Sequence, residues 1–190
     1  MSELKPANRF QEAFGLPVPG ARTKVKEHME ESVMDFIRSS PFAVLATSDQ
    51  GGHCDASPRG GTPGLVRVID KRRLLLPDLA GDCLFQSYGN VDDNGHVGLL
   101  FFITGRDHTV RINGRARPID QTEVETLQTE LSVYWHDDNT KIVQGLLIIE
   151  VDEAYGHCTR AEVFQPMGRR NHRKESRNAL SSRRICPLCP

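Results

Sequence analysis

The spacing of apolar positions near the start of the chain is that of a helix. Apolar residues recur three and four positions apart from residue 25 to residue 37, with charged residues between them, which predicts a helix capped by Thr23. The helix should end at Ser39 or Ser40, because the residue before Pro41 avoids the α region. The apolar stripe consists of Val25, Met29, Val33, Phe36 and Ile37.

From residue 42 onward the apolar positions alternate as they do in strands. Glycine-containing or charged turns at residues 49–52, 70–72 and 104–107 separate the segments, and the Gly- and Pro-rich residues 58–64 predict an irregular connection. Many short strands without strand–helix alternation predict a mainly β antiparallel barrel or sandwich. The predicted strands cover residues 42–47, 53–57, 65–69, 74–76, 96–102, 109–118 and 142–151.

Two further helices flank these strands. A short one is expected between Asp82 and Tyr88, and a second starts at Asp120, where Asp-Gln-Thr-Glu resembles a capping box. Val124, Leu127 and Leu131 would line its buried face. We therefore expect three parts: an extended N-terminal arm at residues 1–22, one barrel domain at residues 23–165, and a flexible tail at residues 166–190.

Charge separates the tail from the body. The tail has a net charge of +6, whereas the rest of the chain carries −7. An acidic body argues against nucleic-acid binding, although a basic tail could contact an anionic partner or the acidic body of a neighbour. The longest apolar run, residues 97–103, is too short to span a bilayer, and the first ten residues lack the apolar stretch of a secretory signal. We expect a cytoplasmic protein that does not enter a membrane.

The five cysteines are expected to be free thiols, because an odd number without a regular framework does not predict disulfides. Cys186 and Cys189 have the spacing of half a zinc knuckle or of a redox pair. A structural zinc needs four ligands, and His157 and Cys158 would complete the set only if the tail folds back. We therefore expect no metal site.

Residues 55–70 contain the donors that a phosphate monoester requires. Ser57 offers a hydroxyl, Arg59 a charged fork, and Gly60 and Gly61 backbone N–H groups, while Arg67 follows in the next strand. The alternative is a surface hairpin with solvated arginines. A second signal is the apolar strand that stops at Pro77 and Asp78, where backbone groups could bond the polar edge of a planar ring or form a simple turn.

Taken together and in order, these motifs resemble a known family. The stretches SPFAVLATSDQGGHCDASPRGGTPGLVRVIDKRRLLLPD and HVGLLFFITGRDHTVRINGRARPI, followed by Tyr155-Gly-His-Cys, are similar to the pyridoxamine 5′-phosphate oxidase-like split-barrel proteins that bind flavin mononucleotide (FMN). The likeness runs from about residue 25 to residue 161 and is closest to the bacterial branch with a Ser-Pro-Arg/Lys-Gly motif.

The resemblance implies a six-stranded antiparallel split barrel with flanking helices, assembled as a homodimer with FMN at the subunit interface. Ser57 and Arg59 would serve the phosphate, and the strand Val66-Arg67-Val68 would lie along the ring. A cation near the ring's N1 and O2 would stabilise the reduced anion. Pro77 and Asp78 would face the ring's polar edge through their backbones, and Thr109 and Arg111 would reach the cofactor from the partner subunit.

Two departures from the family pattern limit what the resemblance implies. The basic phosphate-binding element expected after the Pro-Asp strand is replaced by Gly81-Asp82-Cys83, and an acid beside a phosphate is unfavourable. The Arg-Leu-X-Pro ending of the true oxidases is absent, so a vitamin B6 substrate is not implied. An FMN-dependent oxidoreductase acting on an unidentified small molecule is the leading hypothesis.

Two other functions remain open at this level. The protein could bind or store flavin without turnover, or the same barrel could hold haem or a deazaflavin. Haem would need an axial ligand, for which His157 and His172 are the candidates. Otherwise His157 is expected to be a hydrogen-bonded core or interface residue.

Overall fold

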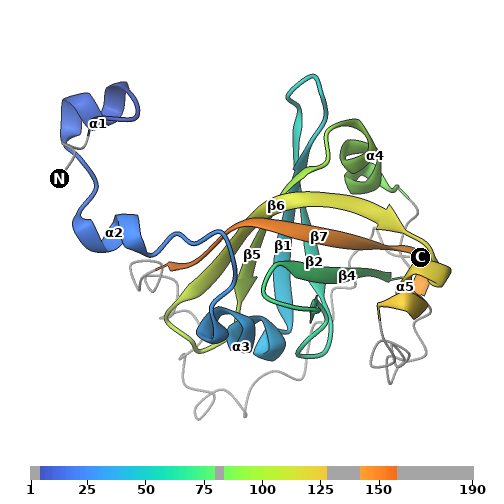
Figure 1. Ribbon diagram of the computed structural model, residues 1–190. Coiled ribbons are helices and arrows are strands. Elements are labelled where there is room, and N and C mark those ends of the chain that lie inside the picture. The colour runs from blue at the N-terminus through green and yellow to red at the C-terminus, as the bar shows by residue number, and fades with distance from the viewer. Residues whose placement is uncertain (1–4, 80–83, 128–141, 158–190) are drawn as a thin grey trace, which may run out of the picture.

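The computed structural model describes residues 5–79, 84–127 and 142–157 of the chain. It shows one antiparallel sheet that curls into a half-open barrel, with helices at its two ends (Figure 1). The strands follow the order β2-β1-β5-β6-β7-β4-β3. The predicted mainly β split barrel is confirmed, with a seventh strand, β3, that contains only two residues.

Strand bounds agree best with the sequence pattern where alternation is strong. The predicted strands at residues 42–47, 96–102 and 109–118 correspond to β1, β5 and β6. The strands are β1 Phe42–Ser48, β2 Cys54–Gly60, β3 Arg67–Val68, β4 Arg73–Leu79, β5 His96–Phe102, β6 Thr109–Ile119 and β7 Ile142–His157.

Alternation along the strands divides the sheet into an inner and an outer face. On β1 the buried residues are Ala43, Leu45 and Thr47, and Leu45 lies directly opposite Leu99 of β5, which in turn faces Ile112 of β6. These side chains form the inner face and the core, because side chains two positions apart point to the same side of a sheet. Phe42, Val44 and Ala46 therefore lie on the outer face.

The backbone around Gly114, in the Asn-Gly step of β6, requires a glycine. The register between β6 and β7 shifts at Asn113 and Gly114, which is the sign of a β-bulge. A Cβ at Gly114 would lie only 2.0 Å from the carbonyl oxygen of Glu150. The close approach of the two backbones therefore requires glycine, and it sets the register that places Tyr155 opposite Arg111.

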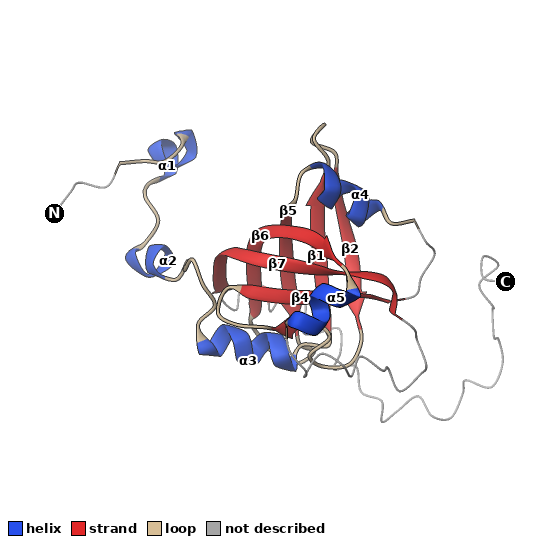
Figure 2. Ribbon diagram, turned by 45° about the vertical axis from the view of Figure 1, so that its right-hand side comes forward, coloured by secondary structure: helices blue, strands red, loops and turns tan. Residues whose placement is uncertain are grey.

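Two helices close the ends of the curled sheet (Figure 2). Helix α3, Glu31–Ser39, buries Val33, Met34, Phe36 and Ile37 in the core. Helix α4, Gln86–Asp93, covers the other end and buries Val91 there.

The predicted start of the first helix at Thr23 was wrong. Residues 24–30 are not helical, because their backbone pairs with other parts of the chain: Lys26 N and O bond Ala154, and Met29 N bonds the carbonyl of Lys71. Met29 is fully buried. It is apolar because it packs in the core, and this made it match the helical spacing although it lies before the helix. Tertiary hydrogen bonds override local periodicity here.

Several other boundaries also differ from the sequence prediction. Strand β2 continues through Pro58 to Gly60, which an edge strand tolerates because proline lacks only an outward N–H. Strand β4 does not stop at the Pro-Asp step but runs to Leu79, and β7 extends to His157. The predicted strand at residues 65–69 is reduced to β3, and α4 begins at Gln86, later than expected.

The N-terminal arm contains two short helices that the sequence reading did not predict. They are α1, Arg9–Phe14, capped by the side chain of Asn8, and α2, Pro19–Thr23. Both lie away from the sheet (Figure 1).

After β6, helix α5, Gln121–Thr126, begins as predicted, with Asp120 Oδ1 accepting a 2.8 Å bond from Glu123 N. Leu131 lies outside the described residues, as do Asp82 and the basic tail. In the part of the chain that the structure describes, no helix is long and apolar enough to cross a membrane.

Candidate functional site

The predicted phosphate residue Arg59 forms an ion pair inside the barrel. Its Nη1 donates to Asp78 Oδ1 at 3.1 Å, and the two side chains are only 19% and 10% exposed. Arg59 lies on β2 and Asp78 on β4, strands that are separated by four others in the sheet. The pair therefore links the two ends of the sheet across the inside of the curl.

Asp78 sits at an irregularity in β4. The register with β7 shifts between Pro77 and Leu79, so Asp78 falls outside the regular ladder. Burial raises the pKa of Asp78, and the attraction of Arg59 and its hydrogen bond oppose this shift without cancelling it. Burial therefore disfavours the charged form of the Asp78 carboxyl more than Arg59 favours it.

Tyr88 of α4 completes this cluster, which we call the inner group: Arg59, Asp78 and Tyr88. Burial raises the pKa of Tyr88, nearby Asp78 raises it further, and Arg59 acts in the opposite direction. Ser57 lies on the same face of β2 as Arg59, two positions away. The Arg59 Nε is buried and has no hydrogen-bond partner, so it is a donor available to a ligand oxygen.

The predicted ring-binding strand is short and partly in the core. Val66 is buried, Val68 packs against the core, and Arg67 is exposed on β3. A Cβ at Gly64, whose φ is +79°, would lie 3.1 Å from the carbonyl oxygen of Arg38 and 3.9 Å from Arg67 Nη1. The Arg67 guanidinium therefore lies near the C-terminus of α3, a favourable place for a cation.

Pro77 is fully buried. Val66 and Pro77 could therefore contact a ring only through their backbones.

A second set of polar side chains lies on the outer face, where β6 and β7 pair. Arg111 lies opposite Tyr155, and Thr109 opposite His157. Arg111 Nη1 donates to the Tyr155 hydroxyl at 3.2 Å, and the Tyr155 and His157 rings are 5.0 Å apart. Lys24 approaches the same tyrosine, so we call Lys24, Arg111, Tyr155 and His157 the outer group.

The two halves of the predicted cofactor site thus lie on opposite faces of one sheet. Arg59 and Asp78 lie inside the curl, whereas Thr109 and Arg111 lie on the outer face of β6. A ligand of flavin size that contacts both sets needs them from two different subunits.

An apolar surface adjoins the outer group. Directly paired residues form a row across five strands, namely Pro58, Val44, Leu100, Arg111 and Tyr155. A parallel row contains Phe42 and Phe102, whose ring centroids are 6.0 Å apart, and Phe42 is 39% exposed. We call Phe42, Val44, Ala46, Ala56, Pro58, Leu100 and Phe102 the outer apolar face.

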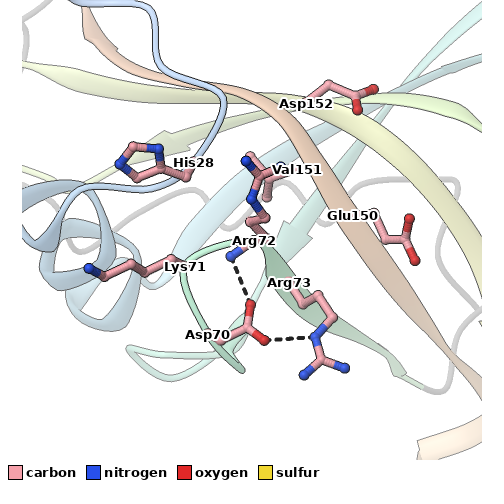
Figure 3. Close-up of a pocket in the computed structure, with 8 residues that line it drawn as sticks. All are labelled: His28, Asp70, Lys71, Arg72, Arg73, Glu150, Val151 and Asp152. Carbon is pink, nitrogen blue, oxygen red and sulfur yellow. Dashed lines mark hydrogen bonds and ion pairs between the residues drawn. The ribbon is translucent and has the colours of Figure 1, made fainter.

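An open hollow of about 790 Å³ lies elsewhere, between the β3–β4 turn and β7 (Figure 3). Its walls carry both charges, and Asp70 already accepts bonds from Arg72 N (2.7 Å) and Arg73 Nε (2.8 Å). None of the nine residues predicted to bind the cofactor lines it. Its lining consists of His28, Asp70, Lys71, Arg72, Arg73, Glu150, Val151 and Asp152.

Comparison with known proteins places the chain in a family. The family model described as pyridoxamine 5′-phosphate oxidase matches residues 29–158, which is well over half of the chain. This chain belongs to that family. The matched segment contains every cofactor residue predicted above, and the suspected family resemblance is confirmed.

Solved structures share the fold of this family member at low identity. HupZ from Group A Streptococcus is 19% identical, with a TM-score of 0.53 over 69% of this chain and 95% of its own. A candidate pyridoxamine 5′-phosphate oxidase from Lactobacillus delbrueckii is 18% identical, with a TM-score of 0.51 over 70% of this chain and 98% of its own. No curated protein sequence matches the chain.

Sequence reasoning missed three members of these groups, namely Tyr88, Lys24 and Tyr155, the last of which was noted only as part of the Tyr-Gly-His-Cys motif. Nothing in the sequence indicated a binding role for Tyr88, which was placed only at the end of a short predicted helix. Lys24 was assigned to a helix, and it reaches Tyr155 only because residues 24–26 run beside β7. Among the described residues no three potential metal ligands cluster together, and Cys186 and Cys189 lie outside them.

Proposed function

We propose that this family member is a homodimer that binds FMN between its subunits and acts as a flavin-dependent oxidoreductase on a small molecule. The observation that carries the proposal is the placement of the predicted cofactor residues on opposite faces of one sheet. Arg59 and Asp78 from one subunit, with Thr109 and Arg111 from the other, would enclose a single ligand.

The outer apolar face supports the dimer. Pro58, Val44 and Leu100 form a continuous row that leads to Arg111, and their side chains are only partly covered within one chain. Pairing two copies through this face would remove apolar surface from water and bring each outer group to the other subunit.

The residues present fit FMN at the phosphate end through Arg59. Its buried Nε lacks a partner, and a phosphate oxygen would satisfy it, while Asp78 holds the guanidinium in place through Nη1. Ser57 on the same face would add a hydroxyl donor. Bound flavin would supply the redox chemistry, and the chain would bind it, orient it and stabilise charge with Arg67 or Arg111.

The first experiment is a visible absorption spectrum of the purified full chain, with any ligand released by denaturation and identified by chromatography. An oxidised-flavin spectrum with FMN released is expected. A colourless protein that takes up no added FMN would contradict both the FMN cofactor and the oxidoreductase hypothesis. Reduction by a nicotinamide cofactor followed by reoxidation would separate an enzyme from a flavin-binding protein without turnover.

Arg67 offers a test at residue level. We expect Arg67→Gln to weaken FMN binding by about tenfold or more, because a hydrogen bond to a charged group contributes roughly 1.5–3 kcal/mol. Arg115→Gln is the matched control, since Arg115 is also an exposed strand arginine but was not predicted to touch the cofactor. Flavin fluorescence during titration gives both dissociation constants, and equal values would contradict the assignment of Arg67.

Haem is the second candidate ligand, and the environment of His157 favours it. Its Nε2 is buried without a partner, and its pKa is lowered by burial and by Arg111 and Lys24, so the imidazole is neutral at pH 7. A neutral imidazole is the form that ligates iron. A Soret band on haem addition that disappears in His157→Ala would favour this candidate, and a band unchanged in that variant would reject His157 as the ligand.

A further inference from the structure

Two cations approach one aromatic ring on the outer face. Lys24 Nζ lies 5.2 Å from the centroid of the Tyr155 ring, and the Arg111 guanidinium carbon lies 5.8 Å from it. Lys24 Nζ also donates to the carbonyl of Gly156 at 3.4 Å. The ring face attracts both cations, and it therefore holds two like charges near each other.

Within the described part of the chain, several arginines have a carboxylate partner, whereas none is found for these two cations. Arg38, Arg73 and Arg117 each form an ion pair with a carboxylate. Within the described residues no carboxylate pairs with Lys24 or Arg111. Glu153, two positions before Tyr155, accepts a 2.9 Å bond from Asn113 instead.

His157 and Tyr155 add uncharged hydrogen-bonding groups to the same place. The Nε2 atom of His157 is buried without a partner, although its ring packs 5.0 Å from that of Tyr155. The Tyr155 hydroxyl accepts from Arg111, which leaves its own proton free to donate. A buried polar atom without a partner is costly, and a ligand oxygen would remove the cost.

We propose that the outer group is a binding site for the anionic group, a carboxylate or a phosphate, of the small-molecule substrate. Lys24 and Arg111 supply the charge, and Tyr155 and His157 supply directed hydrogen bonds. That the anion belongs to a substrate rests on the proposed function, which places Arg111 and Thr109 beside the flavin of the partner subunit. The flavin itself is the other possible source of the negative charge.

The test is a calorimetric titration of the full chain with inorganic phosphate and with benzoate, before and after loading with FMN. We expect saturable binding in both states. Lys24→Ala and His157→Leu should each weaken it by about fivefold or more, since hydrogen bonds to charged groups are the strong ones. Arg115→Ala is the control, because it removes an exposed cation from the same face of β6 outside the outer group.

The outcomes separate the site from the cofactor. Binding that is absent, that is unchanged in Lys24→Ala and His157→Leu, or that falls equally in Arg115→Ala would overturn the proposal. Loss of anion binding on FMN loading would overturn the substrate assignment, because the flavin would then fill the site. Anion binding that depends on Lys24 and His157 in a protein that takes up no FMN would support the site while the proposed cofactor fails.

Discussion

The inner and outer groups use similar residue types under opposite conditions. In the inner group Arg59 is buried against Asp78, so the chain itself supplies the counter-charge. In the outer group Lys24 and Arg111 share a tyrosine ring, and no described carboxylate neutralises them. The inner group therefore has its counter-charge within the chain. The outer group has none among the described residues, which is the arrangement expected of an interface or a binding site.

The largest expected effect on stability comes from breaking the ion pair between Arg59 and Asp78. Asp78→Ala should lower the free energy of unfolding by about 3 kcal/mol, because it leaves a buried arginine without its carboxylate. Arg111→Ala should cost less than about 1 kcal/mol, because it breaks no ion pair and lies on the outer face. Urea unfolding of both variants, with the slope checked for constancy, measures the difference.

A double variant shows whether stability depends on the charges of Arg59 and Asp78 or only on the volume that their side chains fill. Replacing Arg59 by Met and Asp78 by Leu should recover most of the lost stability, because apolar pairs of similar volume substitute well for buried ion pairs. A double variant as unstable as Asp78→Ala would mean that the site needs the ion pair itself.

An intermediate effect is expected at the outer apolar face. Val44→Glu places two carboxylates, one from each subunit, in the proposed interface, and like charges there cost several kcal/mol. We expect the dimer dissociation constant to rise at least about a hundredfold, which is about 2.7 kcal/mol. Sedimentation velocity over a range of concentrations measures it, with Lys71→Glu in the β3–β4 turn as the control. Unchanged dimerisation would move the interface to another surface.

The smallest effect is the pH dependence of stability, in which the two groups should have opposite slopes. The pKa of Asp78 is raised from 3.8, mainly by burial, so its contribution is greatest below pH 3.8 and is lost as the pH rises through the raised value. The pKa of His157 is lowered from 6.5 by burial, Arg111 and Lys24, so its contribution is present above pH 6.5 and is lost as the pH falls.

Unfolding free energies of the wild type, Asp78→Asn and His157→Gln between pH 3.5 and 7.5 give the two slopes as differences. Slopes of the same sign would contradict the raised pKa of Asp78 or the lowered pKa of His157.

Local sequence signals were sufficient wherever an element depends on its own residues. Strands β1, β5 and β6 were predicted within a residue or so, because their alternation and the turns between them are encoded locally. The cap at Asp120 was correct for the same reason. The helix start at Thr23 failed because Lys26 and Met29 find their hydrogen-bond partners far away in the chain, at Ala154 and Lys71.

For the candidate site, the sequence by itself determined the family, the curled sheet and the motifs that contain Arg59 and Arg111. Only the tertiary structure decided that Arg59 meets Asp78 across the barrel, and that Lys24 comes to rest against Tyr155. The physical reason is that these contacts depend on how the sheet curls and on the register of the β6–β7 bulge. Both are set by packing and by backbone pairing between distant segments, which no local pattern of residues records.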